Sequence, residues 1–179
     1  DAMKNQKGLK IAEEELKNFN SPSNFNEDLT AYPFKYFRES SARLPASMLL
    51  MIDRIVGFWE KGGKNKKGFI RAEKDVVSSD WFFKAHFFQD PVQPGSLGVE
   101  ALIQLIKFYM LHEEYHKDMN NPVFEPVAIE TEAEWHYRGQ VTPDKKLIIM
   151  DMEVLEADKK GKMVTAEARL WVDGLKIYH

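Results

Sequence analysis

The residues best suited to chemistry lie close together in the middle of the chain. His86 stands among aromatic residues, Gly95 follows two prolines, and Glu100 comes early in the apolar segment that follows. An imidazole can accept a proton near neutral pH, a carboxyl group can return one, and amides at a helix N-terminus can bind a developing oxyanion. A base, an oxyanion site and an acid within 15 residues favour proton transfer next to a carbonyl group.

Taken singly, these residues also have ordinary structural interpretations. A histidine beside Phe87 and Phe88 is most often a satisfied core or boundary residue. Glu100, Gln104 and Lys107 share one helical face and can form the solvated stripe of a buried helix. The alternative is that Glu100 faces a cavity and that Gln104, one turn away, holds it by a hydrogen bond.

The loop before the apolar segment favours the catalytic interpretation. Ser96 is a candidate N-cap residue, and Gly95 would let a substrate approach the backbone closely. Free amides there would lie at the positive end of the helix dipole. An ordinary capped loop remains the alternative.

Composition limits the class of protein. The chain has 179 residues, 44% of them hydrophobic, and a net charge of −3. This length corresponds to about one domain, and the charge gives no indication of nucleic acid or an anionic membrane as a partner. The absence of cysteine excludes disulfides and thiolate chemistry. With no transmembrane run and no signal peptide, we expect a cytoplasmic protein.

Hydrophobic periodicity predicts an α+β fold, with one long buried helix against a mostly antiparallel sheet. The helix is expected over residues 97–114, and Asp173-Gly174 is a strong hairpin signal. Alternating apolar residues predict the strands, which are expected at residues 69–76, 129–138, 147–155, 164–172 and 175–178.

The chain divides into two parts. Residues 1–30 are expected to be a tail or an interdomain linker, with one short amphipathic helix at residues 11–19. Residues 31–179 form the predicted domain. Its last strand stops at His179, so we expect that strand to be incomplete and the chain to be a piece of a longer protein.

A second histidine motif points to zinc only superficially. His112-Glu113-Glu114-Tyr115-His116 matches the H-E-x-x-H pattern. No third ligand follows at a metalloprotease spacing, so we interpret this segment as the charged, solvated end of the helix. His136 is expected to be exposed on a strand. No metal site is predicted.

The central motif resembles that of a known family. The run from His86 to Ala101 is similar to the active-site motif of the 3-hydroxydecanoyl-acyl-carrier-protein dehydratases, and matching segments extend over residues 44–178. The resemblance implies the hotdog fold, a long helix wrapped by a curved antiparallel sheet. It also implies dehydration of a 3-hydroxyacyl thioester to a trans-2-enoyl thioester, without a cofactor.

The resemblance assigns roles to individual residues. His86 would remove the α-proton, and Glu100 would protonate the departing hydroxyl group. The Gly95 amide, beside Ser96, would bind the thioester carbonyl. Gln104 would support the carboxylate, and the Val92 carbonyl would orient the histidine. Along the central helix, an acyl tunnel would be lined by the aromatic residues Trp81, Phe82 and Phe83.

Departures from the family pattern favour a dehydratase that does not isomerise. The carboxylate is Glu100 rather than aspartate, Gln93 replaces a common methionine, and Ser96 replaces a frequent cysteine. These features resemble dehydratase domains of polyunsaturated fatty acid and polyketide synthases. The alternatives are a bifunctional dehydratase and isomerase, a hotdog thioesterase, and a non-catalytic acyl-binding hotdog.

The resemblance also implies partners. The substrate would be carried on acyl carrier protein. In the family two hotdogs pair, with the histidine from one and the carboxylate from the other. We therefore expect a homodimer, or a pseudo-dimer with a neighbouring hotdog domain.

Overall fold

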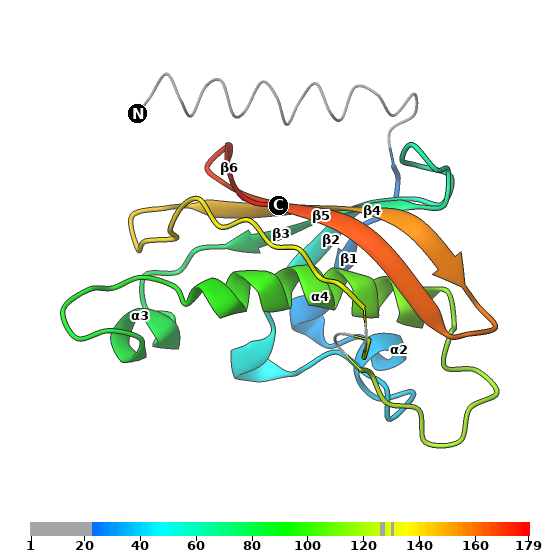
Figure 1. Ribbon diagram of the computed structural model, residues 1–179. Helices are drawn as coiled ribbons and strands as arrows, with labels where there is room; N and C mark the ends of the chain where they lie inside the picture. Colours follow the sequence, from blue (N-terminus) through cyan, green and yellow to red (C-terminus); the bar gives the residue numbers. More distant parts are fainter. Residues whose placement is uncertain (1–22, 126–127, 130) are drawn as a thin grey trace.

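The structure is a computed structural model that describes residues 23–125, 128–129 and 131–179. One antiparallel sheet dominates it, with its strands in the order β1-β2-β3-β4-β5-β6. The sheet curves over a single long helix (Figure 1). The strands are β1 (Glu27–Asp28), β2 (Arg54–Trp59), β3 (Phe69–Asp75), β4 (Leu147–Asp158), β5 (Met163–Val172) and β6 (Leu175–Tyr178).

The long helix, α4 (Gly95–His112), forms the second layer. Its apolar residues cover most of its circumference, so it is buried against the sheet, as predicted. No helix in the described ranges has the length and apolar character needed to cross a membrane. The sheet meets α4 with the alternate residues of its strands, which include Ile70, Met150, Met152, Val154 and Leu170, each 0% exposed.

The opposite face of the sheet carries a buried polar cluster. Arg71 and Asp151 are paired across β3 and β4, and two hydrogen bonds of 2.7 and 2.9 Å join their side chains. Trp171 of β5 donates a third, of 3.1 Å, to the same carboxylate. Because Asp151 is 0% exposed, its charge depends on these donors for compensation.

Close packing joins the last strand to the helix. A methyl group added at Gly98 of α4 would lie 1.8 Å from the ring of Tyr178 in β6. Only glycine leaves room for the ring there, so the two elements approach more closely than side chains normally permit. The Asp173-Gly174 turn before β6 has positive φ at both residues, 48° and 81°, as the hairpin prediction requires.

The domain begins earlier than predicted. Residues 23–30 were expected to belong to a tail or linker, but Glu27 and Asp28 pair with β2, and Leu29 is completely buried. Phe25 also packs edge-on against Phe58 and Phe108. The sequence did not indicate this part of the domain, because its apolar residues are spaced too widely to form a periodic pattern. The expected helix at residues 11–19 lies outside the described residues.

Short helices complete the layer beside α4. These are a 3₁₀ turn η1 (Leu29–Ala31), α2 (Phe34–Phe37), a 3₁₀ turn η2 (Ser47–Leu49) and α3 (Trp81–Ala85). Figure 1 shows α2 and α3 on the side of α4 away from the sheet. The loop after α3 leads directly into α4, so this connection carries most of the candidate catalytic residues.

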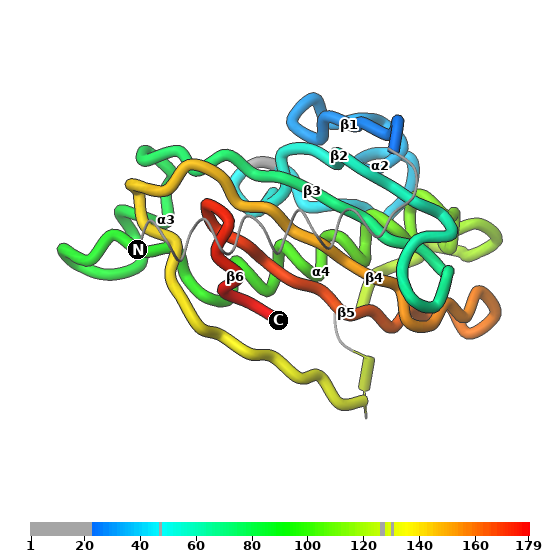
Figure 2. Tube along the Cα trace, turned by 90° about the horizontal axis from the view of Figure 1, so that it is seen from above, coloured from blue at the N-terminus to red at the C-terminus, as the bar shows by residue number. Residues whose placement is uncertain are grey.

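The strand predicted over residues 129–138 is largely wrong. In its described part, backbone pairing is confined to residues 136–138: His136 and His179 exchange hydrogen bonds of 2.7 and 3.2 Å, and Arg138 donates to Ile177. Tyr137 and Tyr178 form an isolated antiparallel bridge. Figure 2 shows this segment running beside β5 without joining it. The sequence does alternate there, but most of the segment has no neighbouring strand.

Candidate active site

His86 is fixed by the loop that follows it. Its backbone amide caps α3 through Phe82, and its Nδ1 lies 3.1 Å from the carbonyl oxygen of Val92. A carbonyl oxygen can only accept, so Nδ1 carries the proton and Nε2 keeps its lone pair. The ring of Phe87 packs on the imidazole, with 3.9 Å between ring centroids. The half-buried histidine is therefore held in the tautomer that can act as a base.

The start of α4 lies next to this loop. The helix begins at Gly95, with Pro94 in the N-cap position and no capping side chain. Ser96 is therefore not the N-cap, and that prediction is wrong: Pro94, with φ of −52°, already sets the helical entry one residue earlier. Gly95 and Ser96 are the first residues of α4, so their backbone N–H groups have no carbonyl acceptor within the helix.

Aromatic rings flank these amides. A methyl group at Gly95 would lie 3.4 Å from the ring of Tyr137 and 3.7 Å from that of Trp135. Sequence analysis missed these two residues, because nothing in a distant alternating segment indicates that it returns to the helix N-terminus. Together the rings and the helix end form an apolar setting for a polar donor.

Glu100 is anchored by two residues on its own helical face. Its Oε1 accepts a hydrogen bond of 3.0 Å from Gln104 and an ion-paired one of 3.1 Å from Lys107. Both donors reach the same oxygen, which leaves Oε2 for another partner. The expected bond between Gln104 and Glu100 is therefore present. The contribution of Lys107 was not predicted, although its spacing along the helix could have indicated it.

Gln104 is buried, which rules out a solvated stripe. It is 0% exposed, its Nε2 also donates to the Leu49 carbonyl at 2.7 Å, and its Oε1 accepts from the Met51 amide at 2.8 Å. One amide side chain thus connects the helix to the loop before β2. This arrangement fixes the side chain that holds Glu100.

No hydrogen bond joins His86 to Glu100 within the described part of this chain. Each has its own set of supporting groups, and the two are brought to the same end of α4 by the intervening loop. The three aromatic residues expected to line an acyl tunnel have different environments. Phe82 and Phe83 are buried in the core, whereas Trp81 is partly exposed and donates its indole N–H to the Met48 carbonyl.

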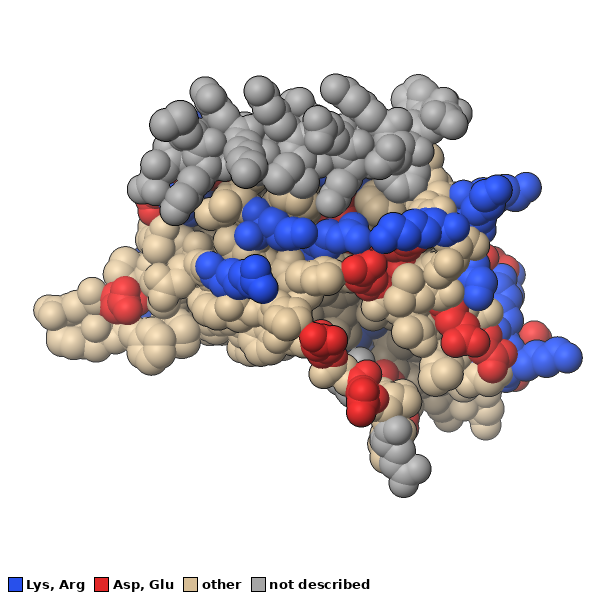
Figure 3. Space-filling model, turned by 45° about the horizontal axis from the view of Figure 1, so that its top comes forward, with Lys and Arg blue, Asp and Glu red and all other residues tan. Residues whose placement is uncertain are grey.

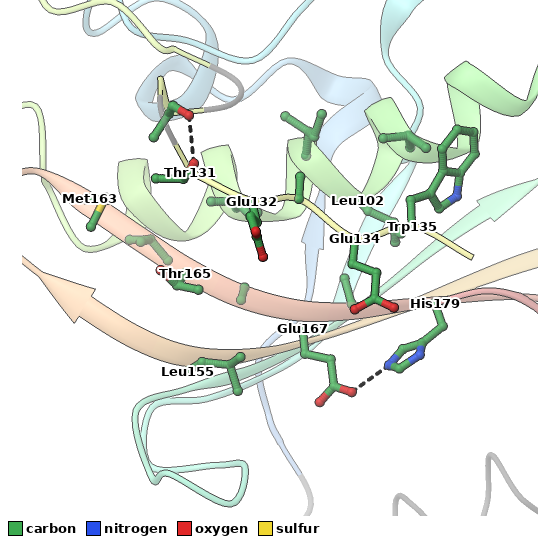
Figure 4. Close-up of a pocket in the computed structure, with 18 of the residues that line it drawn as sticks. Leu102, Thr131, Glu132, Glu134, Trp135, Leu155, Met163, Thr165, Glu167 and His179 are labelled. Carbon is green, nitrogen blue, oxygen red and sulfur yellow. Dashed lines mark hydrogen bonds and ion pairs between the residues drawn. The ribbon is translucent and has the colours of Figure 1, made fainter. Parts of the chain in front are cut away.

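A groove of about 600 Å³ lies beside this site, between α4, the first half of β5 and the segment ending at His136. Its floor is apolar and contains Val99, Ile103 and Ile106. Figure 4 shows Glu167 of β5 pointing to His179, which lies 2.6 Å away. That hydrogen bond holds the pKa of Glu167 below its usual value.

The H-E-x-x-H segment is structural. His112 was expected at a solvated helix end, but its ring packs against Phe25 and Phe58, and its Nδ1 lies 3.0 Å from the Tyr36 hydroxyl. Burial, assisted by the nearby Lys35 ammonium, lowers the pKa of His112. Across the described ranges, no group of three or more acidic or histidine side chains is placed to hold a metal ion. His136 is exposed, as predicted.

A comparison with protein families identifies the family of this chain. A family model described as a FabA-like domain matches residues 44–179, which is most of the chain. The chain belongs to the FabA-like family. Its α+β architecture is therefore the hotdog fold, and the six-stranded curved sheet over α4 has that form. The family includes 3-hydroxyacyl-acyl-carrier-protein dehydratases, and its domains typically act on acyl thioesters and dimerise.

Proposed function

We propose that this FabA-like domain dehydrates 3-hydroxyacyl thioesters carried on acyl carrier protein to trans-2-enoyl thioesters, as a step of fatty acid or polyketide synthesis. The hydrogen bond from Nδ1 of His86 to the Val92 carbonyl carries the proposal, because it leaves Nε2 as the basic atom. No bond within the described residues occupies that nitrogen. The basic nitrogen therefore remains available to a substrate.

The reaction starts with the α-proton of the thioester. Nε2 of His86 removes this proton, and negative charge develops on the thioester oxygen. The amide of Gly95, at the positive end of α4, donates to that oxygen and stabilises the enolate. Ser96 contributes the next amide of the same helix end.

The second half of the reaction breaks the bond between C3 and its hydroxyl oxygen. A proton on Oε2 of Glu100 passes to the hydroxyl, which leaves as water while the double bond forms between C2 and C3. Gln104 and Lys107 both donate to Oε1 of Glu100, so two donors orient the carboxyl group while Oε2 transfers the proton. His86 retains the α-proton until it is exchanged with solvent and Glu100 is reprotonated.

The site is proposed to combine two domains. His86 and Glu100 of one chain make no hydrogen bond to each other in the described structure, and dimers are typical of the family. In a homodimer, or in a pseudo-dimer with another hotdog domain, His86 of one domain would face Glu100 or its equivalent in the other. The acyl chain would then run along α4, near the aromatic residues of α3.

The test is to incubate the protein with a medium-chain 3-hydroxyacyl thioester and to identify products by mass spectrometry. We expect loss of water, and a loss of about 10³-fold or more in rate for His86→Ala. His116→Ala is the matched control, because that histidine lies beyond the C-terminal end of α4, at the opposite end of the helix from Gly95. Full turnover by His86→Ala would refute the proposal.

A second variant separates the two proton transfers. Glu100→Gln should stop water loss but keep exchange of the α-proton with deuterated solvent, because His86 is intact. The position of the double bond distinguishes a dehydratase from an isomerising enzyme. Release of free thiol, in place of an enoyl thioester, would instead identify a thioesterase.

A further inference from the structure

Gln93 differs from the other buried polar side chains in the described part of the chain. It is 2% exposed, yet neither its Oε1 nor its Nε2 has a hydrogen-bond partner there. The other buried polar residues all form hydrogen bonds through their side chains; they are Arg71, Gln104, Asp151 and Glu153. A buried amide without partners is costly. Such a group indicates a position that serves function rather than stability.

The backbone of Gln93 lies between two functional groups of the proposed site. Its amide donates to the Val141 carbonyl at 2.9 Å, which fixes this part of the loop. The preceding Val92 carbonyl accepts from His86. Two residues after Gln93, α4 begins at Gly95, whose amide has no acceptor within the helix. One short loop therefore carries the acceptor that orients the base, an unpaired side-chain amide and the oxyanion donor.

The surroundings of this loop are apolar rather than ionic. Figure 3 shows the end of the molecule that carries α3 and the loop as largely uncharged, whereas charged side chains gather elsewhere on the same face. Phe87 and Phe88 of the loop are 55% and 90% exposed, and Phe82 and Phe83 of α3 are buried. A mainly apolar molecule with one polar group suits this environment better than an ion does.

Burial limits what can reach the side-chain amide of Gln93. A partner domain that docks on the surface cannot contact an amide that its own chain already covers. The carrier arm of an acyl thioester cannot contact it either, because that arm must lead from the site to the solvent. The remaining candidate is the part of the substrate that enters deepest, which is the acyl chain beyond C3.

We propose that Gln93 is a specificity-determining residue, and that the preferred substrate is an acyl chain with a second oxygen function beyond C3. This inference rests on the proposed function, because it requires a 3-hydroxyacyl chain in the site. A side-chain amide has two donor hydrogens and one acceptor oxygen, so it can pair with a hydroxyl or a carbonyl group. A site that hydrogen-bonds a substrate group strongly rejects the analogue that leaves its own polar group unpaired.

The chemistry of chain extension indicates where the second oxygen lies. Chains built two carbons at a time have their oxygen functions on odd-numbered carbons. An oxygen that is not removed in an earlier cycle therefore lies at C5, C7 or C9. The reaction that supplies the substrate must leave this oxygen in place. A saturated chain without it would offer the amide of Gln93 no partner.

The experiment compares 3-hydroxydecanoyl thioester with analogues that carry a second hydroxyl group at C5, C7 or C9. We expect the parent protein to prefer at least one analogue by about 10²-fold in kcat/KM. Gln93→Met replaces the amide with an apolar side chain of similar size, so it should abolish the preference and still dehydrate the plain chain. Gln89→Met is the matched control, because it makes the same exchange at an exposed position of the same loop. It should keep the preference.

Two further measurements separate this inference from the proposed function. Calorimetry with His86→Ala, which should not turn the thioesters over, should show the same preference as a difference in affinity. If no chain is dehydrated but this difference remains, the proposed function fails and the role of Gln93 stands. Without ligand, Gln93→Met should raise the melting temperature by about 2–4 °C, because it removes the unpaired amide.

Three results would overturn the proposal. The first is equal kcat/KM and equal affinity for all four chains in the parent protein. The second is a preference that survives in Gln93→Met, because another residue would then bind the second oxygen. The third is a lower melting temperature of Gln93→Met, which would show that a buried water already satisfies the amide.

Discussion

At the scale of single residues, Gln104 has more hydrogen bonds than any other side chain of the candidate site. It bonds the Leu49 carbonyl, the Met51 amide and the carboxylate of Glu100. Such a side chain serves stability and orientation together, because a buried amide left without its partners is costly. The effect of Gln104 on stability and its effect on the orientation of Glu100 can be measured separately on one variant.

Gln104→Leu should therefore destabilise the fold and slow the reaction. We expect a loss of about 1–3 kcal/mol in the free energy of unfolding, and a fall in dehydration rate on the order of 10²-fold, because Glu100 loses an orienting donor. Denaturant unfolding and product formation below the unfolding midpoint measure the two effects. Exchange of the α-proton, which depends on His86, should persist; its loss would mean that Gln104 supports the whole site.

His112 gives the fold a pH dependence. Its pKa is lowered by burial, so between that value and about 6.5, the usual histidine pKa, the unfolded state binds more protons. The stabilising effect of neutral His112 is complete above about pH 6.5 and is lost as pH falls toward the folded-state pKa. The melting temperature should drop from about pH 7.5 to about pH 5.5.

His112→Gln is the control for that titration. It keeps a polar group near the Tyr36 hydroxyl and removes the titratable ring, so its melting temperature should vary less over the same interval. If variant and parent lose stability in parallel, another group is responsible.

At the scale of elements, the pairing register of the strands creates the buried polar cluster of the sheet. Arg71, Asp151 and Trp171 come from three neighbouring strands and meet only because β3, β4 and β5 pair as they do. The carboxylate lies on the sheet face opposite α4, away from the apolar core. The cluster is thus a marker of correct strand pairing.

Asp151→Ala should be strongly destabilising. It removes both carboxylate oxygens that accept hydrogen bonds from Arg71 in the described structure. The buried guanidinium is left without compensation, at a cost of about 3–5 kcal/mol. Arg71→Met combined with Asp151→Leu should cost far less, because no buried charge is left unpaired. Urea unfolding of the single and double variants checks both expectations. A loss below about 1 kcal/mol in the single variant would show that Arg71 is solvated.

The elements were largely predictable, and the exceptions have physical causes. The apolar run that gives α4 and the alternation that gives β4 and β5 are local signals, and the structure confirms them. The segment around Trp135 alternates equally well, but a strand also needs a paired neighbour, and only residues 136–138 have one.

The candidate site was predictable to a similar extent. The motif located His86, Gly95 and Glu100, and the bond from Gln104 followed from helical spacing. The partners of His112 and the rings beside Gly95 come from distant segments of the chain, so no local sequence pattern indicates these contacts. The start of α4 was misplaced because Ser96 looked like a cap while Pro94 set the helix.

At the scale of the whole molecule, subunit pairing decides whether the proposed site is complete. If His86 of one protomer works with Glu100 of another, then two inactive variants can restore each other. Random mixing places half of the molecules in mixed dimers, each with one intact site and one doubly altered site.

Mixing His86→Ala with Glu100→Gln should thus recover about one quarter of the parent activity after unfolding and refolding together. Each variant refolded alone is the control and should stay inactive. Sedimentation should give the mass of a dimer for all three samples. Failure to recover activity from mixed dimers would place both groups of each site on the same protomer.

Gln104 also determines which changes the loop before β2 can accept in related sequences. Both loop atoms that it contacts belong to the backbone. Side chains at positions 49 and 51 can therefore be exchanged without altering the anchor of Glu100, provided the buried Met51 position stays apolar. Inserting or deleting one residue there would shift the carbonyl and the amide together. The loop should thus vary in composition among homologues but keep its length.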